Sequence, residues 1–129
     1  MSDIRSILKM ERLVFDKISF ERLGFKNENS LTHTLEASFA KNIKDNMYRV
    51  TLMLKGEKKD EYTFEISLTG FFSFSSDEET DGELQNELIS KNTVAIMMPY
   101  LRSQLSLLTA QPEVDCVILP PFNINKMME

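Results

Sequence analysis

The spacing of apolar residues changes once along this chain of 129 residues, and that change restricts the possible folds most strongly. Between residues 13 and 74, apolar and polar side chains alternate. From residue 84 onward, apolar side chains recur every three or four positions. The first pattern is that of a strand with one buried face, and the second is that of a helix. We therefore expect strands followed by helices.

Four segments have the alternation of strands, and they span residues 13–23, 31–43, 47–55 and 62–74. In the first, Ile18 and Phe20 share a face, and in the second Leu35, Ala37 and Phe39 do. The third and fourth are apolar at alternate positions: Tyr48, Val50, Leu52, Leu54, Tyr62, Phe64, Ile66 and Leu68. Short polar connections at residues 42–46 and 56–60 favour antiparallel hairpins.

The helical part is predicted to have a short helix ending near Ser90 and a longer one from about Met97 to Thr109. Pro99 fits a first helical turn, where the missing N–H of proline loses no hydrogen bond. An apolar segment at residues 114–122 follows Pro112. The longer helix is apolar on more than one side, which predicts a second contact surface and hence a homo-oligomer.

These elements predict an α+β fold in which a four-stranded antiparallel sheet, a meander, is followed by helices packed on one face. Residues 1–129 are expected to form a single domain, with residues 1–12 as a flexible segment or a short N-terminal extension. The composition, 42% hydrophobic and 27% charged, is that of a folded globular chain.

The charge and the single cysteine restrict the partners and the location. The net charge is −5 and the basic residues are scattered, which opposes nucleic-acid binding. We expect no disulfide, because Cys116 is the one cysteine of the chain. We also expect a cytoplasmic location without membrane insertion, because neither a signal-like run nor a stretch of about 20 apolar residues occurs.

The side chains that could carry catalysis do not form a recognisable set. His33 stands alone at a strand entry, and Cys116 is interpreted as a buried structural thiol. The acidic run at residues 77–79 is interpreted as a solvated loop. Neither zinc-ligand spacing nor a glycine-rich phosphate loop is present. We therefore expect a protein that is not an enzyme and needs no metal or cofactor.

Five short stretches, in order, resemble the SecB family of protein-export chaperones. Residues 15–21 (FDKISFE) are similar to the family's first strand, and residues 45–50 (DNMYRV) to its turn into the third. Residues 70–74 (GFFSF) look like its fourth-strand ending. Residues 97–102 (MMPYLR) resemble its Leu–Phe–Pro–Tyr–Ala–Arg helix start, and residues 119–124 (LPPFNI) its Leu–Ala–Pro–Val–Asn–Phe segment.

The resemblance implies a fold, an assembly and partners. Sheets would pair into dimers, and long helices would pack two dimers into a homotetramer. Unfolded preproteins would lie in long apolar grooves between the sheet, the segment that follows the long helix and the chain terminus. The protein would keep them competent for export and pass them to the SecA motor.

The resemblance and the apolar pattern together select candidate site residues, although each apolar residue among them could also belong to the core. The predicted peptide-binding residues are Leu31, Phe71, Phe72, Phe74, Met97, Met98, Tyr100, Val117, Leu119, Pro120, Phe122 and Met127. The acidic residues Glu21 and Glu65 match SecA-contacting acids of the family. The predicted oligomer-interface residues are Ile18, Leu101, Leu105 and Leu108.

Three departures from the family pattern keep other functions open. Leu31 stands where the family has an aromatic residue, Lys17 replaces an acid, and Thr63 replaces a leucine. One alternative is a SecB-like chaperone dedicated to a toxin–antitoxin system, in which the client is the antitoxin. Another is a non-chaperone adaptor or small-ligand module, for which one compact pocket is expected instead of a long groove.

Overall fold

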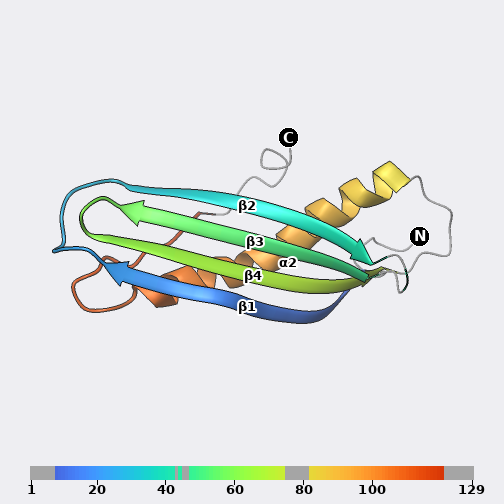
Figure 1. The fold of residues 1–129 in the computed structure, drawn as a ribbon, viewed down its shortest axis with the longest axis horizontal. Helices are drawn as coiled ribbons and strands as arrows, with labels where there is room; N and C mark the ends of the chain where they lie inside the picture. The colour runs from blue at the N-terminus through green and yellow to red at the C-terminus, as the bar shows by residue number, and fades with distance from the viewer. Residues whose placement is uncertain (1–7, 43, 45–46, 75–81, 121–129) are drawn as a thin grey trace.

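The structure is a computed structural model that describes residues 8–42, 44, 47–74 and 82–120. In this part of the chain, four antiparallel strands precede one helix, which lies along one face of the sheet (Figure 1). The elements are β1 (Leu8–Arg22), β2 (Leu31–Asn42), β3 (Met47–Lys58), β4 (Tyr62–Phe74) and α2 (Gly82–Thr109). The predicted α+β class is confirmed.

The order of strands across the sheet is β1-β4-β3-β2. Strands β2, β3 and β4 form the predicted meander, but β1 pairs with β4 at the opposite edge, so a meander of all four strands was wrong. Alternation indicates which face of a strand is buried, but it does not indicate which strand lies beside it. The eight-residue connection at 23–30 lets the chain cross the end of the sheet and leaves the most apolar strand, β4, in the interior.

Strand β1 starts at Leu8, so residues 8–12 belong to the sheet and are not an extension. Its pairing with β4 skips one residue at each of two irregularities, and the skipped residues are Glu11 and Asp16. Both carboxylates accept a hydrogen bond from a hydroxyl group of β4, Glu11 from Ser73 at 2.8 Å and Asp16 from Thr69. Bulges of this kind add twist and bend to an edge strand.

Helix α2 is one continuous element, so the prediction of two helices was wrong. Pro99 lies in its interior and not in a first turn. Packing against the sheet holds the helix together although proline removes one backbone hydrogen bond there. Among the described residues, no helix is long and apolar enough to cross a membrane.

The core lies between α2 and the inner face of β3 and β4. Its fully buried apolar side chains are Val50, Leu52, Leu54, Ile66, Leu68, Phe72, Val94, Met97, Leu101 and Leu105. The predicted buried faces of β3 and β4 are therefore confirmed. The edge strands are less well covered, because α2 packs on the two central strands. Phe39 on β2 is 39% exposed and Ile18 on β1 is 44% exposed, although both lie on the helix side.

Candidate functional site

The segment that follows α2 turns back and runs along the helix, which holds it through three polar side chains. Arg102 donates to the carbonyl of Leu119 at 3.1 Å, and Ser106 donates to the carbonyl of Val117 at 2.8 Å. Thr109 accepts the N–H of Val117 at 2.8 Å. These three residues share one helical face because they are spaced by four and three positions. We call residues 114–120 the crossover segment.

A groove of about 550 Å³ lies between α2 and the crossover segment. Its lining residues are Pro99, Arg102, Ser103, Ser106, Leu107, Ile118 and Leu119. Leu107 is 70% exposed and Ile118 is 79% exposed, so large apolar side chains from both walls are accessible to solvent. Such exposure of paired aliphatic side chains is typical of a surface that binds another apolar chain. We call this feature the crossover groove.

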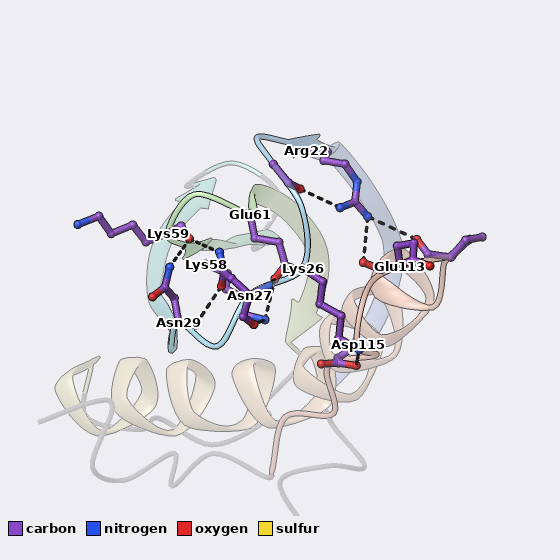
Figure 2. A network of polar contacts seen from close by, with 11 residues as sticks. Arg22, Lys26, Asn27, Asn29, Lys58, Lys59, Glu61, Glu113 and Asp115 are labelled. Atoms are coloured by element: carbon purple, nitrogen blue, oxygen red, sulfur yellow. Dashed lines mark hydrogen bonds and ion pairs between the residues drawn. The ribbon is translucent and has the colours of Figure 1, made fainter.

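A polar network fixes the start of the crossover segment to the sheet (Figure 2). The guanidinium group of Arg22, at the end of β1, donates to the carbonyl oxygens of Glu113 at 3.0 Å and Pro112 at 3.4 Å. Lys26 forms an ion pair with Asp115 at 2.8 Å. Glu113 adopts a left-handed backbone with φ of 63°, which reverses the chain after the helix. The route of the crossover segment is thus set by contacts with β1 and the connection after it.

The same network joins the β1–β2 connection to the β3–β4 turn around one buried carboxylate. Glu61 is fully buried, and its Oε1 accepts from Lys58 at 2.7 Å and from the N–H of Asn27 at 2.9 Å. Lys58 also donates to the carbonyl of Asn27 at 2.8 Å. Asn27 and Asn29 both donate to the carbonyl of Lys59 at 2.9 and 2.8 Å (Figure 2). Two loops far apart in sequence are therefore held as one unit.

The ion pairs of this network shift the pKa values of its members. The hydrogen bond from Lys58 lowers the pKa of Glu61, and it outweighs burial, which acts in the opposite direction. The hydrogen bond between Lys26 and Asp115 raises the pKa of the lysine and lowers that of the aspartate. Glu61, Lys26 and Asp115 therefore keep their charges through the neutral range.

Five of the predicted peptide-binding residues are core residues in the structure. Phe72 and Met97 are fully buried, and Phe74, Met98 and Leu119 are 4%, 4% and 6% exposed. With so little exposed area they offer little surface to a client. The assignment of Phe72, Phe74, Met97 and Met98 to a groove is corrected, because the apolar stripes of β4 and α2 close on each other. Leu119 does line the crossover groove, although little of its side chain is exposed.

The other predicted peptide-binding residues are more accessible, but they do not form one surface. Tyr100 is 46% exposed on the outer side of α2, and Val117 and Pro120 lie on the crossover segment, half-buried and exposed respectively. Phe71 is half-buried on the sheet face away from α2, opposite the direction of Phe72. Leu31 is half-buried at the start of β2. The remaining two, Phe122 and Met127, lie outside the described residues.

The predicted oligomer-interface residues fall into two groups. Leu101 and Leu105 are fully buried in the chain's own core, so their assignment to an interface is corrected. Leu108 is half-buried and packs against the core. Ile18 is exposed at the β1 edge of the sheet and could reach another chain. The apolar stripe of the helix was predicted correctly, but Leu101 and Leu105 pack against the sheet of the same chain and not against another copy.

The two acidic residues assigned to SecA contact lie on the open face of the sheet, by which we mean the face away from α2. Glu21 is exposed there, opposite Thr63 of β4. Glu65 forms ion pairs with Lys17 and, at 3.7 Å, with Lys55. The hydrogen bond from Lys17 lowers the pKa of Glu65. The charge of Glu65 is therefore already compensated by two lysines, Lys17 of β1 and Lys55 of β3.

Two reactive side chains noted in the sequence, Cys116 and His33, are both exposed in the structure. Cys116 is exposed on the crossover segment, so its interpretation as a buried thiol was wrong. Its Sγ lies 3.4 Å from the carbonyl of Ser106. His33 is exposed on β2. Among the described residues, His, Cys, Asp and Glu side chains never gather in a group of three that could hold a metal ion.

Of the residues that line the crossover groove, sequence reasoning selected Leu119 and missed the others. The polar stripe of Arg102, Ser106 and Thr109 was a detectable signal, because it runs beside the apolar stripe at helical spacing. Leu107 lies off the apolar stripe of the helix, which was a signal for its exposure, whereas the exposure of Ile118 had none. Both are aliphatic residues in apolar surroundings, and burial depends on what packs against them.

Comparisons with known proteins agree with the fold. No family model matches the chain. It is 34% identical over 104 residues to an uncharacterized protein of Methanocaldococcus jannaschii, which matches 72% of this chain. The chain spans about 61% of that curated relative's length. One similar solved structure is a protein of unknown function from Streptococcus agalactiae, with a TM-score of 0.53, 10% identity, and coverage of 88% of this chain and 96% of that one.

Another similar solved structure is the Mycobacterium tuberculosis SecB-like chaperone Rv1957, in complex with a ChAD peptide from the HigA1 antitoxin Rv1956. The TM-score is 0.69 at 14% identity, and the match covers 92% of this chain and 93% of that one. The likeness extends over the sheet and the helix together. The chain therefore has a SecB-like fold.

Proposed function

We propose that this protein is a SecB-like chaperone that holds unfolded polypeptide segments in the crossover groove. The observation that carries the proposal is the solvent exposure of Leu107 and Ile118 on the two walls of that groove. Aliphatic surface recognises apolar segments without requiring a particular sequence, as a chaperone must. The SecB-like fold supports the same function.

Hydrogen bonds between α2 and the crossover segment hold the two walls of the groove together. The polar atoms of the crossover backbone at Val117 and Leu119 are occupied by α2 side chains. These backbone atoms are thus hydrogen-bonded within the protein, while the Ile118 side chain between them is exposed to solvent. A client segment would be held mainly by apolar contact, about 1.5 to 3 kcal/mol for each large side chain buried.

Two kinds of client are compatible with such a groove. A similar fold is known bound to an antitoxin peptide, which favours an antitoxin as the client here. The export role expected from the family, with preproteins passed to SecA, is the second candidate. It is less well supported, because Glu65, one of the acids assigned to SecA, is ion-paired with Lys17 and Lys55.

The test is suppression of aggregation of an unrelated unfolded protein, comparing wild type with the double variant Leu107→Ser, Ile118→Ser. Both side chains are exposed, so the fold should survive, as circular dichroism would verify. We expect client affinity to fall by at least about tenfold, because two apolar contacts are lost. A folded double variant with wild-type activity would contradict the proposal.

The matched control is Phe25→Ser. Phe25 is 93% exposed in the β1–β2 connection and does not line the groove, so this variant also removes exposed apolar surface but none from the groove. It should hold clients as well as the wild type does. Adding SecA to client complexes distinguishes the two client classes. Release of a preprotein by SecA would favour export, whereas selective protection of a purified antitoxin from proteolysis would favour the dedicated role.

A further inference from the structure

A row of residues on the open face of the sheet, distinct from the crossover groove, places an aromatic ring between two arginines. The strand register aligns Arg12 of β1 with Phe71 of β4, Phe71 with Arg49 of β3, and Arg49 with Ala40 of β2. Residues paired directly across antiparallel strands share a face and lie about 5 Å apart. Both arginines are exposed and Phe71 is half-buried.

Within the described residues, the two arginines differ from three lysines of the same sheet in having no ion-pair partner. Lys9, Lys17 and Lys55 each form an ion pair with a glutamate. Across the described residues, neither Arg12 nor Arg49 forms an ion pair. An arginine guanidinium group is the side chain best suited to grip a carboxylate through two hydrogen bonds. The row therefore has two such groups that no carboxylate of the described residues pairs with.

The nearest acids on β1 have partners other than the two arginines, and Glu11 is also ion-paired with Lys9. Glu11 accepts a hydrogen bond from Ser73, and Asp16 accepts one from Thr69. These are the two bulge residues, so their carboxylates are tied to hydroxyl groups of the neighbouring strand. The protein has a net charge of −5, so two exposed arginines in one row, both without an ion pair to any described residue, stand out on its surface.

A cavity of about 390 Å³ adjoins the row at the end of β2 and β3. Its lining residues are Ala40, Lys41, Asn42, Met47, Tyr48, Arg49 and Phe71. This lining, taken from the described residues, combines apolar surface with two cations and includes no acid. A cavity of this size admits an apolar side chain, and its charge favours a negatively charged neighbour.

We propose that this row is a docking surface for an acidic, extended polypeptide segment of a partner protein. An apolar side chain of the segment contacts Phe71, and carboxylates on either side of it bind Arg12 and Arg49. In an extended chain, side chains two positions apart point the same way and are about 7 Å apart. Carboxylates two positions before and two after the apolar residue therefore span about 13 Å, which two long arginine side chains can reach.

The probe is a fluorescein-labelled peptide with the core Glu-Ser-Leu-Ser-Glu, measured by fluorescence polarisation against the full-length protein. Two comparison peptides replace either both glutamates by lysine or the leucine by serine. We expect the wild type to prefer the first peptide, and to bind it more weakly as salt rises. The double variant Arg12→Glu, Arg49→Glu should lose about tenfold in affinity and prefer the lysine peptide.

The control variant is Lys55→Gln, which removes a cation of the same face that is already ion-paired. It should bind the glutamate peptide as the wild type does. Phe71→Ala should weaken the leucine peptide but not its serine counterpart. Unchanged affinity in the folded double variant, or no preference of the wild type for the glutamate peptide, would overturn the inference. The groove variant Leu107→Ser, Ile118→Ser leaves this surface intact, so failure of the two proposals can be told apart.

Discussion

At the scale of single residues, Glu61 shows how one buried carboxylate organises a set of loops. It has no exposed surface, and its Oε1 binds both the Lys58 ammonium group and the backbone of Asn27. Its Oε2 has no hydrogen-bond partner among the described residues. A buried charge is tolerated only with a partner, so Lys58 and Glu61 depend on each other.

The substitution Glu61→Gln should lower stability in a pH-dependent way. The pKa of Glu61 is lowered from its ordinary value of 4.5, so its charge stabilises the fold above that value. The stabilisation is lost as the pH falls through the lowered pKa of the folded state. At neutral pH we expect a loss of about 1–2 kcal/mol, because a hydrogen-bonded charge is removed.

Denaturation of both proteins by urea, from about pH 7 down to about pH 3, measures this effect. The gap between wild type and variant should be largest at neutral pH and shrink in acid, where both side chains are neutral. Glu21→Gln is the control, because Glu21 is exposed on β1. A gap that stays constant down to about pH 3 would mean that the charge of Glu61 is not responsible.

At the scale of elements, α2 makes two different contacts through two stripes of side chains. Its apolar stripe, which includes Leu101 and Leu105, fills the core, and its polar stripe binds the crossover segment. Thr109 contributes to both the core and the contact with the crossover segment. It is fully buried, and its hydroxyl group donates to the carbonyl of Leu105 at 2.9 Å and accepts from the N–H of Val117. It is the point at which the helix fixes the start of the groove wall.

Replacing Thr109 by the similarly shaped valine should loosen the crossover segment. The N–H of Val117 would lose its acceptor, at a cost of about 1 kcal/mol, or more if water cannot reach it. We expect faster amide hydrogen exchange at residues 116–119, with most of the sheet unchanged. Ser103→Ala is the control, because Ser103 is exposed on the same helix. Unaltered exchange at Val117 would show that the threonine hydroxyl is dispensable.

At the scale of the whole molecule, the single chain leaves apolar surface uncovered on several sides. Ile18 and Val14 are exposed on opposite faces of β1, and Tyr100 and Leu107 are exposed on α2. The surplus of apolar surface predicted for the helix is therefore present, but it lies at positions other than the predicted Leu101 and Leu105. Exposed apolar patches of this kind are commonly covered by a second copy of the chain.

A homotetramer, arranged as a dimer of dimers, remains our prediction for the assembly. Multi-angle light scattering at micromolar concentration should give a mass four times the 14.9 kDa of the chain. Ile18→Glu at the sheet edge should reduce the mass by disrupting contacts made there, because it buries a charge at an apolar interface. A monomer in the wild type would contradict the prediction.

Much of the fold could be predicted because it depends on local spacing. The alternation of Val50, Leu52 and Leu54 fixed both the strand and its buried face, and β4 was predicted with its observed bounds. The site was predicted less well. Methionine and phenylalanine residues chosen for a groove, such as Met97 and Phe72, turned out to be core, since the sequence does not reveal which of two apolar surfaces close on each other.

The sequence by itself determined the element types, the order of strands before helix, and the residues that face the core on β3 and β4. Only the tertiary structure decided that β1 joins β4, that one helix covers the two central strands, and that Ile118 stays exposed. Periodicity is a property of neighbours in sequence, whereas pairing and burial depend on residues far apart. The contact between Arg22 and Glu113, 91 positions apart, is of that second kind.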